Sequence, residues 1–134
     1  QETQEVFSKE VMADLTYSLK GTITGGTGSA ALALGRPAAG KTGTSQSNAS
    51  AWFSAYTPQL AASVALFRDS ASESLNGIGG LTSVTGGTFP ARIWTAFMKG
   101  ALKGEPVMDF PAPSNIGGLD PVVMTSGGKQ TPKP

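Results

Sequence analysis

The chain has 134 residues, with ten Lys and Arg against nine Asp and Glu and a formal net charge of +1, a length that suits one small domain. It contains no Cys and no His, which excludes disulfides and thiolate sites and removes the commonest metal ligand and general base. Because the charge is nearly balanced and no basic run is present, we expect no nucleic acid partner. No cluster of acidic residues suggests a metal site, and we expect no cofactor.

The first predicted element is an amphipathic helix at about residues 9–20. Ser8 is a favourable N-cap, and Gly21 is expected to end the helix. The apolar residues that recur at helical spacing, and would share one buried face, are Val11, Met12, Leu15 and Leu19. The Gly-rich residues 25–28 then predict a turn or a close approach between backbone segments.

Three strand-like segments follow, at residues 38–44, 51–57 and 60–67. The second alternates with a period of two, which indicates one buried and one exposed face. The third is nearly continuous in apolar and small residues, which is typical of a strand covered on both faces. The short turn at residues 57–59 predicts that the last two strands form an antiparallel hairpin.

A second helix is predicted after a Ser- and Gly-rich loop at residues 69–88. Pro90 lies near its start, Gly104 near its end, and a wide apolar stripe lies between them. After Phe110 the last 24 residues include five Pro and four Gly. We therefore divide the chain into a domain segment at residues 1–110 and a flexible, Pro- and Gly-rich tail at 111–134.

These elements sum to an α+β fold of three antiparallel strands flanked by an N-terminal and a C-terminal helix. A three-stranded sheet leaves two open edges, and the apolar segment at 60–67 is typical of an interior strand. We therefore expect strands and helices outside this chain to complete the fold.

Two motifs overlap at Lys41. Residues 35–42, Gly-Arg-Pro-Ala-Ala-Gly-Lys-Thr, match the phosphate-binding P-loop, and residues 41–44, Lys-Thr-Gly-Thr, match a signature of serine acyltransferases that react with penicillin. A P-loop needs a helix that begins at its Gly-Lys-Thr, whereas residues 43–48 are poor helix formers and lead into a strand. Nucleotide binding is therefore kept only as a third alternative.

The Lys-Thr-Gly motif has a chemical logic on the edge of a strand. The Lys41 ammonium would face a substrate carboxylate or hold a neighbouring Ser in place, and Gly43 would let the ligand approach the backbone closely. The Thr44 N–H would be one donor of an oxyanion hole. The alternative is that Lys41 is an exposed strand lysine beside a Gly turn.

The residues around the motif closely resemble the C-terminal half of the transpeptidase domain of class A penicillin-binding proteins. The resemblance spans about residues 5–110, and the segments that carry it, all in the order of the family, are residues 6–15, 26–28, 35–44, 50–60 and 90–98. Their order and number make this match far more specific than the four-residue motif alone.

The resemblance implies a membrane-anchored enzyme on the extracytoplasmic face that cross-links peptidoglycan stem peptides through a serine acyl-enzyme and is acylated by β-lactams. It implies a larger antiparallel sheet with helices on both sides. By this resemblance Lys41 and Thr44 are catalytic, and Thr42, Gly43 and Thr44 bind the substrate. The Thr42 and Thr44 hydroxyls would contact a carboxylate, and the Thr44 N–H would face the acyl oxygen.

The chain departs from the family pattern in one respect. The family carries Ser-x-x-Lys, with the nucleophile, and Ser-x-Asn before Lys-Thr-Gly, and neither precedes Lys41 here. Residues 126–129 and 74–76 fit these patterns but follow Lys41, so we reject both as catalytic. The nucleophile is expected in the remainder of the same enzyme. The alternative is a non-catalytic module that binds peptidoglycan or a protein partner.

Overall fold

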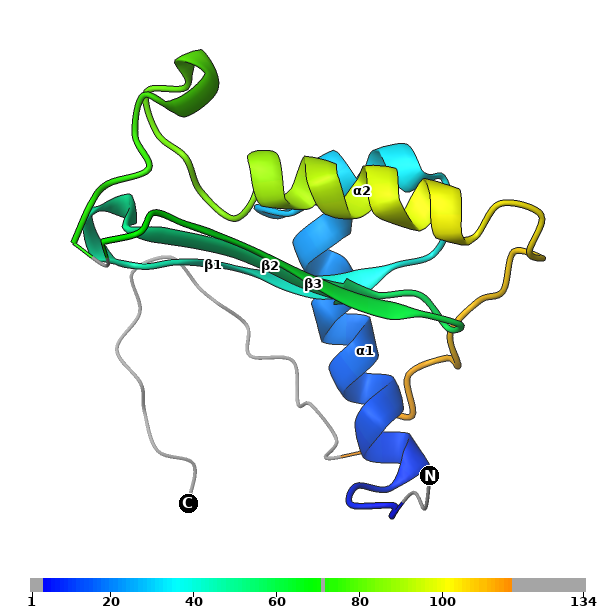
Figure 1. Cartoon of the computed structure of the whole chain (residues 1–134). Helices are drawn as coiled ribbons and strands as arrows, with labels where there is room; N and C mark the ends of the chain where they lie inside the picture. Colours follow the sequence, from blue (N-terminus) through cyan, green and yellow to red (C-terminus); the bar gives the residue numbers. More distant parts are fainter. Residues whose placement is uncertain (1–3, 71, 117–134) are drawn as a thin grey trace, which may run out of the picture.

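The computed structural model describes residues 4–70 and 72–116 as a three-stranded sheet with one helix across a face and another beside an edge (Figure 1). Its elements are α1 (Lys9–Thr24), η1 (Ser29–Leu34), β1 (Ala39–Thr44), η2 (Gln46–Asn48), β2 (Ser50–Tyr56), β3 (Ala61–Phe67), η3 (Ile78–Gly80) and α2 (Phe89–Ala101). In this part of the chain neither α-helix has the length and apolar character needed to cross a membrane.

The first helix begins where the sequence predicts and ends later. The Ser8 hydroxyl accepts a hydrogen bond from the Val11 N–H at 3.3 Å, which confirms the N-cap. The helix continues past Gly21 to Thr24, so the predicted end at residue 20 is wrong. The added turn carries Ile23, whose burial in the core stabilises it more than one glycine weakens it.

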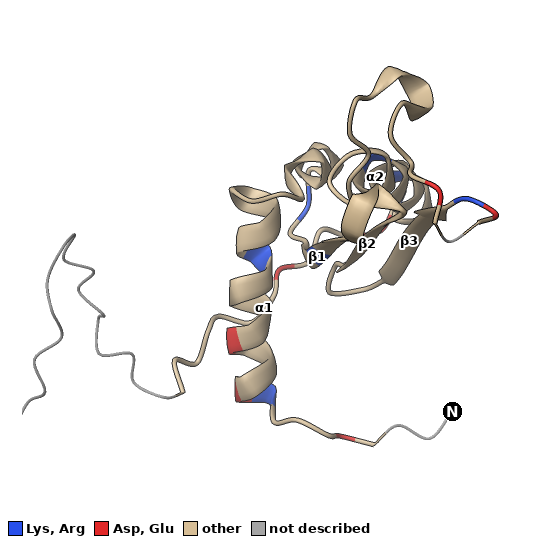
Figure 2. Cartoon of the chain, turned by 90° about the vertical axis from the view of Figure 1, so that its left-hand side faces the viewer, with Lys and Arg blue, Asp and Glu red and all other residues tan. Residues whose placement is uncertain are grey.

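The predicted buried face of α1 is also wrong. Of its four residues Val11, Met12 and Leu15 are exposed and Leu19 is half-buried, whereas the buried residues are Ala13, Thr16 and Ile23. The cause is the position of the helix, which runs beside β1 and extends its N-terminal half beyond the sheet (Figures 1 and 2). The residues of α1 that are buried are small ones and Ile23 of its last turn, whereas the larger apolar side chains Val11, Met12 and Leu15 are exposed.

The sheet has the order β1-β2-β3 with antiparallel pairing throughout, which confirms the predicted strands and hairpin. Within the described residues β3 is an edge strand, with half-buried side chains on one face and mostly exposed ones on the other. The prediction that both of its faces are covered is therefore not met by this part of the chain. The central strand is β2, whose Phe53 and Ala55 are buried beneath α2.

The helix α2 is fastened to the sheet by Trp94. Its indole ring meets the Phe53 ring edge to face, with ring centres 5.4 Å apart. Its N–H lies 3.2 Å from the Ala55 carbonyl oxygen and 3.1 Å from that of Ala62, so one donor spans β2 and β3. The core residues around this contact are Ile23, Ala31, Leu34, Ala38, Phe53, Ala55, Ala91, Trp94, Met98 and Leu102.

The segment after α2, residues 102–116, crosses back to α1, and we call it the strap (Figure 1). Near its start the Arg36 guanidinium donates to three of its carbonyl oxygens, those of Leu102 (2.8 Å), Glu105 (2.8 Å) and Pro106 (3.0 Å). Basic groups commonly satisfy carbonyl groups left open at a helix C-terminus. Arg36 therefore joins the segment before β1 to the end of α2.

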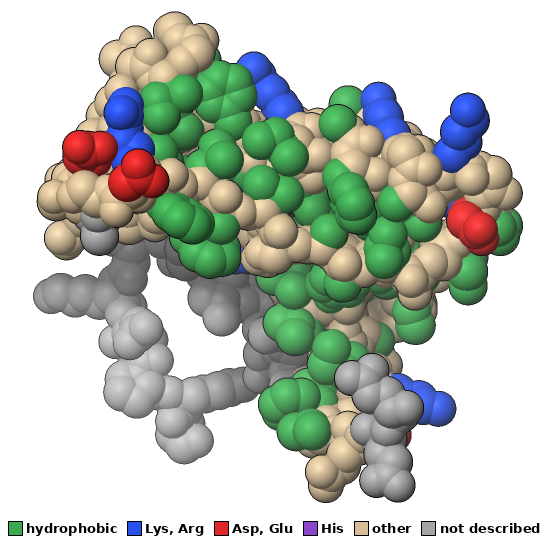
Figure 3. Space-filling model, in the orientation of Figure 1, with side chains coloured by type: hydrophobic (Ala, Val, Ile, Leu, Met, Phe, Trp, Pro, Cys, Tyr) green, Lys and Arg blue, Asp and Glu red, His purple; other side chains and the backbone are tan. Residues whose placement is uncertain are grey.

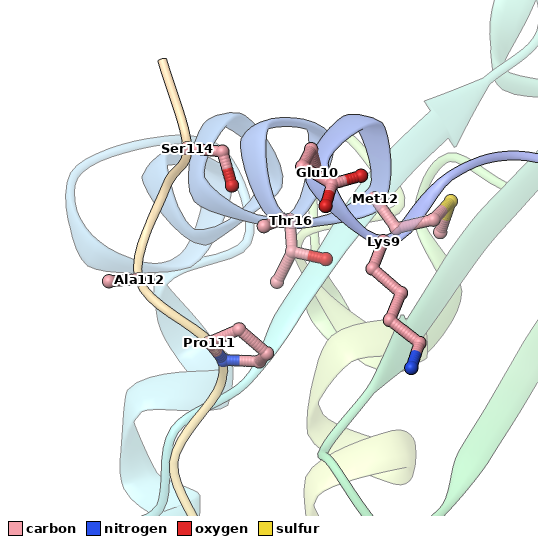
Figure 4. A pocket seen from close by; sticks show the side chains of 8 residues that line it. Lys9, Glu10, Met12, Thr16, Pro111, Ala112 and Ser114 are labelled. Atoms are coloured by element: carbon pink, nitrogen blue, oxygen red, sulfur yellow. The ribbon is translucent and has the colours of Figure 1, made fainter. Parts of the chain in front are cut away.

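The far end of the strap lies against α1. The Asp14 carboxylate accepts hydrogen bonds from the backbone N–H groups of Ser114, Asn115 and Ile116. A hollow of about 350 Å³ between Pro111, Ser114 and the helix remains open (Figure 4). The division of the chain at residue 110 stays a prediction, since residues 117–134 lie outside the described part.

Candidate active site

The Lys-Thr-Gly-Thr motif lies on β1, at one edge of the described sheet, as the sequence predicts. Lys41 is exposed, and it is the only charged residue of β1, β2 and β3, all of which the structure describes in full. Its ammonium group donates to the Thr42 carbonyl oxygen at 2.9 Å. The other charged residues among those described belong to the helices and loops (Figure 2), so the lysine forms an isolated positive charge on the sheet.

The structure excludes a P-loop at this place. Gly40, Lys41 and Thr42 are extended strand residues, and the helical turn that follows, η2, has only three residues and an interrupted helical geometry at Ser47. Gly40 instead packs against β2, where a β-carbon would lie 2.7 Å from the Ala55 Cα. The glycine is needed for close strand packing, and no helix N-terminus is available to bind a phosphate.

The side of the sheet that Lys41 faces is open and carries several hydroxyl groups among small apolar residues. The lysine pairs with Ser54 across the strands, and the Ser54 hydroxyl lies 2.6 Å from that of Ser63 on β3. On the same side the Tyr56 hydroxyl lies 2.9 Å from that of Thr16 on α1. A hollow of about 490 Å³ is lined here by Leu19, Gly40, Lys41, Ser54, Ala55, Tyr56, Ala61, Ala62 and Ser63.

None of the residues that line this hollow is acidic. The Lys41 charge therefore has no carboxylate beside it within the described part of the chain, and the adjoining hydroxyls of Ser54 and Ser63 can donate or accept hydrogen bonds. Such a surface can bind an anionic group by charge attraction and hydrogen bonding.

The two threonines of the motif are held by residues from distant turns, to which the sequence alone assigns no role in the site. The Thr42 hydroxyl lies 2.6 Å from the Thr27 hydroxyl, and the Thr44 hydroxyl accepts a hydrogen bond from the Gly86 N–H at 3.2 Å. No local pattern predicts these contacts, because their partners are 15 and 42 residues away along the chain. The only available signal was the clustering of glycines around Thr27 and at Gly86.

Gly86 and Gly87 pack directly on the motif strand. A β-carbon at Gly86 would lie 2.8 Å from the Gly43 carbonyl oxygen and 2.9 Å from its nitrogen. One at Gly87 would collide with the Thr27 carbonyl oxygen. Since real β-carbons do not approach so closely, these positions require glycine and fix the distance between β1 and the start of α2.

The rejected serine motifs remain without a catalytic setting. The Ser74 hydroxyl accepts the Asn76 N–H at 3.2 Å, and the Asn76 side-chain oxygen accepts from the Asn48 amide at 2.6 Å. Leu75 between them is buried in a small second core under the loop. This segment therefore has a structural role, and residues 126–129 lie outside the described part of the chain.

Comparison with known proteins finds homologues of the chain, although no protein-family model matches it. Over 120 residues it is 38% identical to penicillin-binding protein 1A of Mycolicibacterium smegmatis, an alignment that covers 86% of this chain and 15% of the relative. It is 40% identical over 92 residues to penicillin-binding protein 1A of Mycobacterium tuberculosis, which covers 65% of this chain and 11% of that relative. The chain thus spans about a seventh or less of the length of these relatives.

Solved structures agree with the sequence comparison. The penicillin-binding protein PonA1 of Mycobacterium tuberculosis superposes with a TM-score of 0.74 and 33% identity over 95% of this chain and 34% of that chain. A second structure of PonA1, in complex with penicillin V, superposes with a TM-score of 0.72 and 36% identity over 81% of this chain and 30% of that one. The chain is therefore homologous to the class A penicillin-binding proteins and has the fold of part of their transpeptidase domain.

Proposed function

We propose that this chain supplies the Lys-Thr-Gly wall of the active site of a peptidoglycan D,D-transpeptidase. The enzyme would join stem peptides through a serine acyl-enzyme and would be acylated by β-lactams. The observation that carries the proposal is the exposed Lys41, an isolated positive charge on an edge strand beside a hollow without acidic residues. Homology to penicillin-binding proteins supports it, as does the penicillin V complex of PonA1.

Each residue of the motif takes a separate role in this proposal. The Lys41 ammonium attracts the ligand carboxylate or holds the nucleophilic serine, which the remainder of the enzyme supplies. The Thr42 hydroxyl donates to the carboxylate, and Gly43 keeps the strand free of a side chain where the ligand backbone lies. The Thr44 N–H is one donor to the oxyanion that develops when the serine attacks.

The proposal includes a place in the cell. Because the substrate is peptidoglycan, the site would face the extracytoplasmic side of the membrane, anchored by a segment other than those described. Its partners would be stem peptides and β-lactams together with the rest of the same enzyme.

The test is covalent labelling of the complete enzyme with a fluorescent penicillin. We expect a labelled band that survives denaturation and disappears after preincubation with unlabelled penicillin. A second candidate is a non-catalytic module that binds peptidoglycan or a protein partner. That candidate predicts pull-down with peptidoglycan and no covalent label, an outcome that would overturn the proposed transpeptidase.

A further inference from the structure

The paired hydroxyls of Thr27 and Thr42 lie at the edge of the motif strand. The two oxygens are 2.6 Å apart, a short hydrogen bond between hydroxyls. Thr27 is exposed and Thr42 is half-buried, so both groups are close to solvent and to any molecule bound along β1. Thr27 belongs to the turn between α1 and η1, and it lies 15 residues before Thr42 in the sequence.

The number of hydroxyl hydrogens in this pair limits the hydrogen bonds that it can donate to a ligand. Each hydroxyl has one hydrogen to donate and two lone pairs. One of the two hydrogens is used inside the pair, so one O–H remains to donate outward. When Thr27 donates to Thr42, the remaining donor is the Thr42 hydroxyl, and it is strengthened because its own oxygen is already accepting.

The turn that carries Thr27 is held in place by backbone contacts. The Gly28 N–H donates to the Thr22 carbonyl oxygen at 2.9 Å, and a β-carbon at Gly28 would lie 2.9 Å from the Phe53 ring. Gly87 packs on the Thr27 carbonyl oxygen from the other side. The hydroxyl of Thr27 is therefore presented to Thr42 by a fixed backbone, which lowers the entropy lost when a ligand orders the pair.

We propose that Thr27 is a positioning residue for ligand recognition: it orients the Thr42 hydroxyl so that its hydrogen points to the carboxylate of the bound peptide or β-lactam. This inference rests on the proposed function, which places a carboxylate beside Thr42. Thr27 acts through Thr42 and does not touch the reacting atoms.

The experiment compares Thr27→Val, Thr27→Ser and wild type in the complete enzyme. Valine keeps the shape of threonine without the hydroxyl, and serine keeps the hydroxyl. The readout is the second-order rate of acylation by a penicillin and by its methyl ester, which lacks the carboxylate charge. We expect Thr27→Val to slow acylation by the free acid about three- to tenfold and to leave the rate of acylation by the ester unchanged. Thr27→Ser should acylate at the wild-type rate with both compounds.

A double variant tests whether Thr27 acts through Thr42. Thr27→Val combined with Thr42→Val should acylate no more slowly than Thr42→Val alone, because the second change removes the group that Thr27 orients. Additive losses, equal losses for acid and ester, or a wild-type rate in Thr27→Val would overturn the inference. If Thr27→Val lowers the melting temperature, Thr27→Ala, which adds no bulk, replaces it. The same ratio of the acylation rates with the acid and with the ester then tests the inference. A wild-type enzyme that takes no label refutes the proposed function instead.

Discussion

The Asp14 carboxylate accepts a hydrogen bond from the Ser114 N–H at 2.6 Å, although 100 residues separate the two along the chain. The N–H groups of Asn115 and Ile116 complete the contact at 2.9 and 2.8 Å. One half-buried Asp on α1 thus holds the end of the strap with its carboxylate. Its hydrogen bonds favour the charged form of Asp14, which makes the contact sensitive to pH.

The first prediction concerns that pH dependence. The Asn115 N–H, assisted by those of Ile116 and Ser114, lowers the pKa of Asp14 below its ordinary value. A lowered pKa means that the contact stabilises the fold above the ordinary value of about 3.9 and is lost as the pH falls through the lowered pKa. Hydrogen exchange of residues 114–116 in the complete enzyme should be slow at neutral pH and should lose protection on acidification.

Asp14→Asn should remove most of this protection at neutral pH. The matched control is Asp109→Asn, which removes a strap carboxylate that forms an exposed ion pair with Lys20 at 3.8 Å and accepts the N–H of its neighbour Phe110 at 2.8 Å. Neither contact involves residues 114–116, so this variant should change their protection little. Equal protection in Asp14→Asn and wild type would show that the carboxylate does not hold the strap.

The second prediction concerns the charge on the sheet. Lys41→Ala in the complete enzyme should slow acylation by a β-lactam about ten- to a hundredfold, since a hydrogen bond to a charged group contributes roughly 1.5–3 kcal/mol. The melting temperature should stay within about 1 °C, because exposed surface residues affect stability little. Lys99→Ala, on α2, is the control and should acylate like wild type. A normal acylation rate in folded Lys41→Ala would remove the lysine from the site.

The third prediction concerns the glycine behind the motif. Gly86→Ala would force a β-carbon against Trp52 and Gly43 of the sheet, and we expect it to lower the free energy of unfolding by about 1–3 kcal/mol and to slow acylation. Gly100→Ala is the matched control, because its β-carbon meets nothing within 4 Å, and alanine is favoured in a helix by about 0.5–1 kcal/mol. Urea unfolding of the complete enzyme measures both. Similar stabilities for the two variants would contradict the packing of Gly86.

The fourth prediction concerns the 134 residues expressed by themselves. They should take no covalent penicillin label, because no Ser-x-x-Lys precedes Lys41, and they should associate through exposed apolar side chains such as Leu15 and Phe67. Fluorescent-penicillin labelling and size-exclusion chromatography give the two readouts. A monomer that accepts the label would place the nucleophile among the serines rejected above.

The sequence predicts those parts of the fold that depend on neighbours along the chain. The hairpin of β2 and β3 follows from alternation and a short turn, and the start of α1 follows from Ser8, since both signals act over a few residues. The buried face of α1 could not be predicted in the same way. Leu15 and Ala13 are both compatible with a helix, and the way α1 packs beside β1 leaves Ala13 buried and Leu15 exposed.

In the candidate site, too, local features could be predicted and long-range contacts could not. Lys41 and its strand could be predicted, because the motif and its poor helix formers are local. The contacts of Thr27 and Gly86 with the motif could not, because they arise only when distant turns fold against β1. Hydrophobic side chains are also exposed over α2, β3 and the N-terminal half of α1 (Figure 3). Their exposure could not be predicted either, because hydrophobic periodicity assigns such residues to the core.

The strap also sets an order of events in folding. Arg36 and Asp14 reach partners that are 66 to 102 residues later in the chain, so during synthesis α1 and β1 leave the ribosome well before their last contacts exist. Loops this long close slowly and late, and the strap should dock after the sheet and α2 have formed. Losing the Asp14 contact should then speed unfolding while leaving the folding rate nearly unchanged. The strap would thus slow the unfolding of a domain that has already formed.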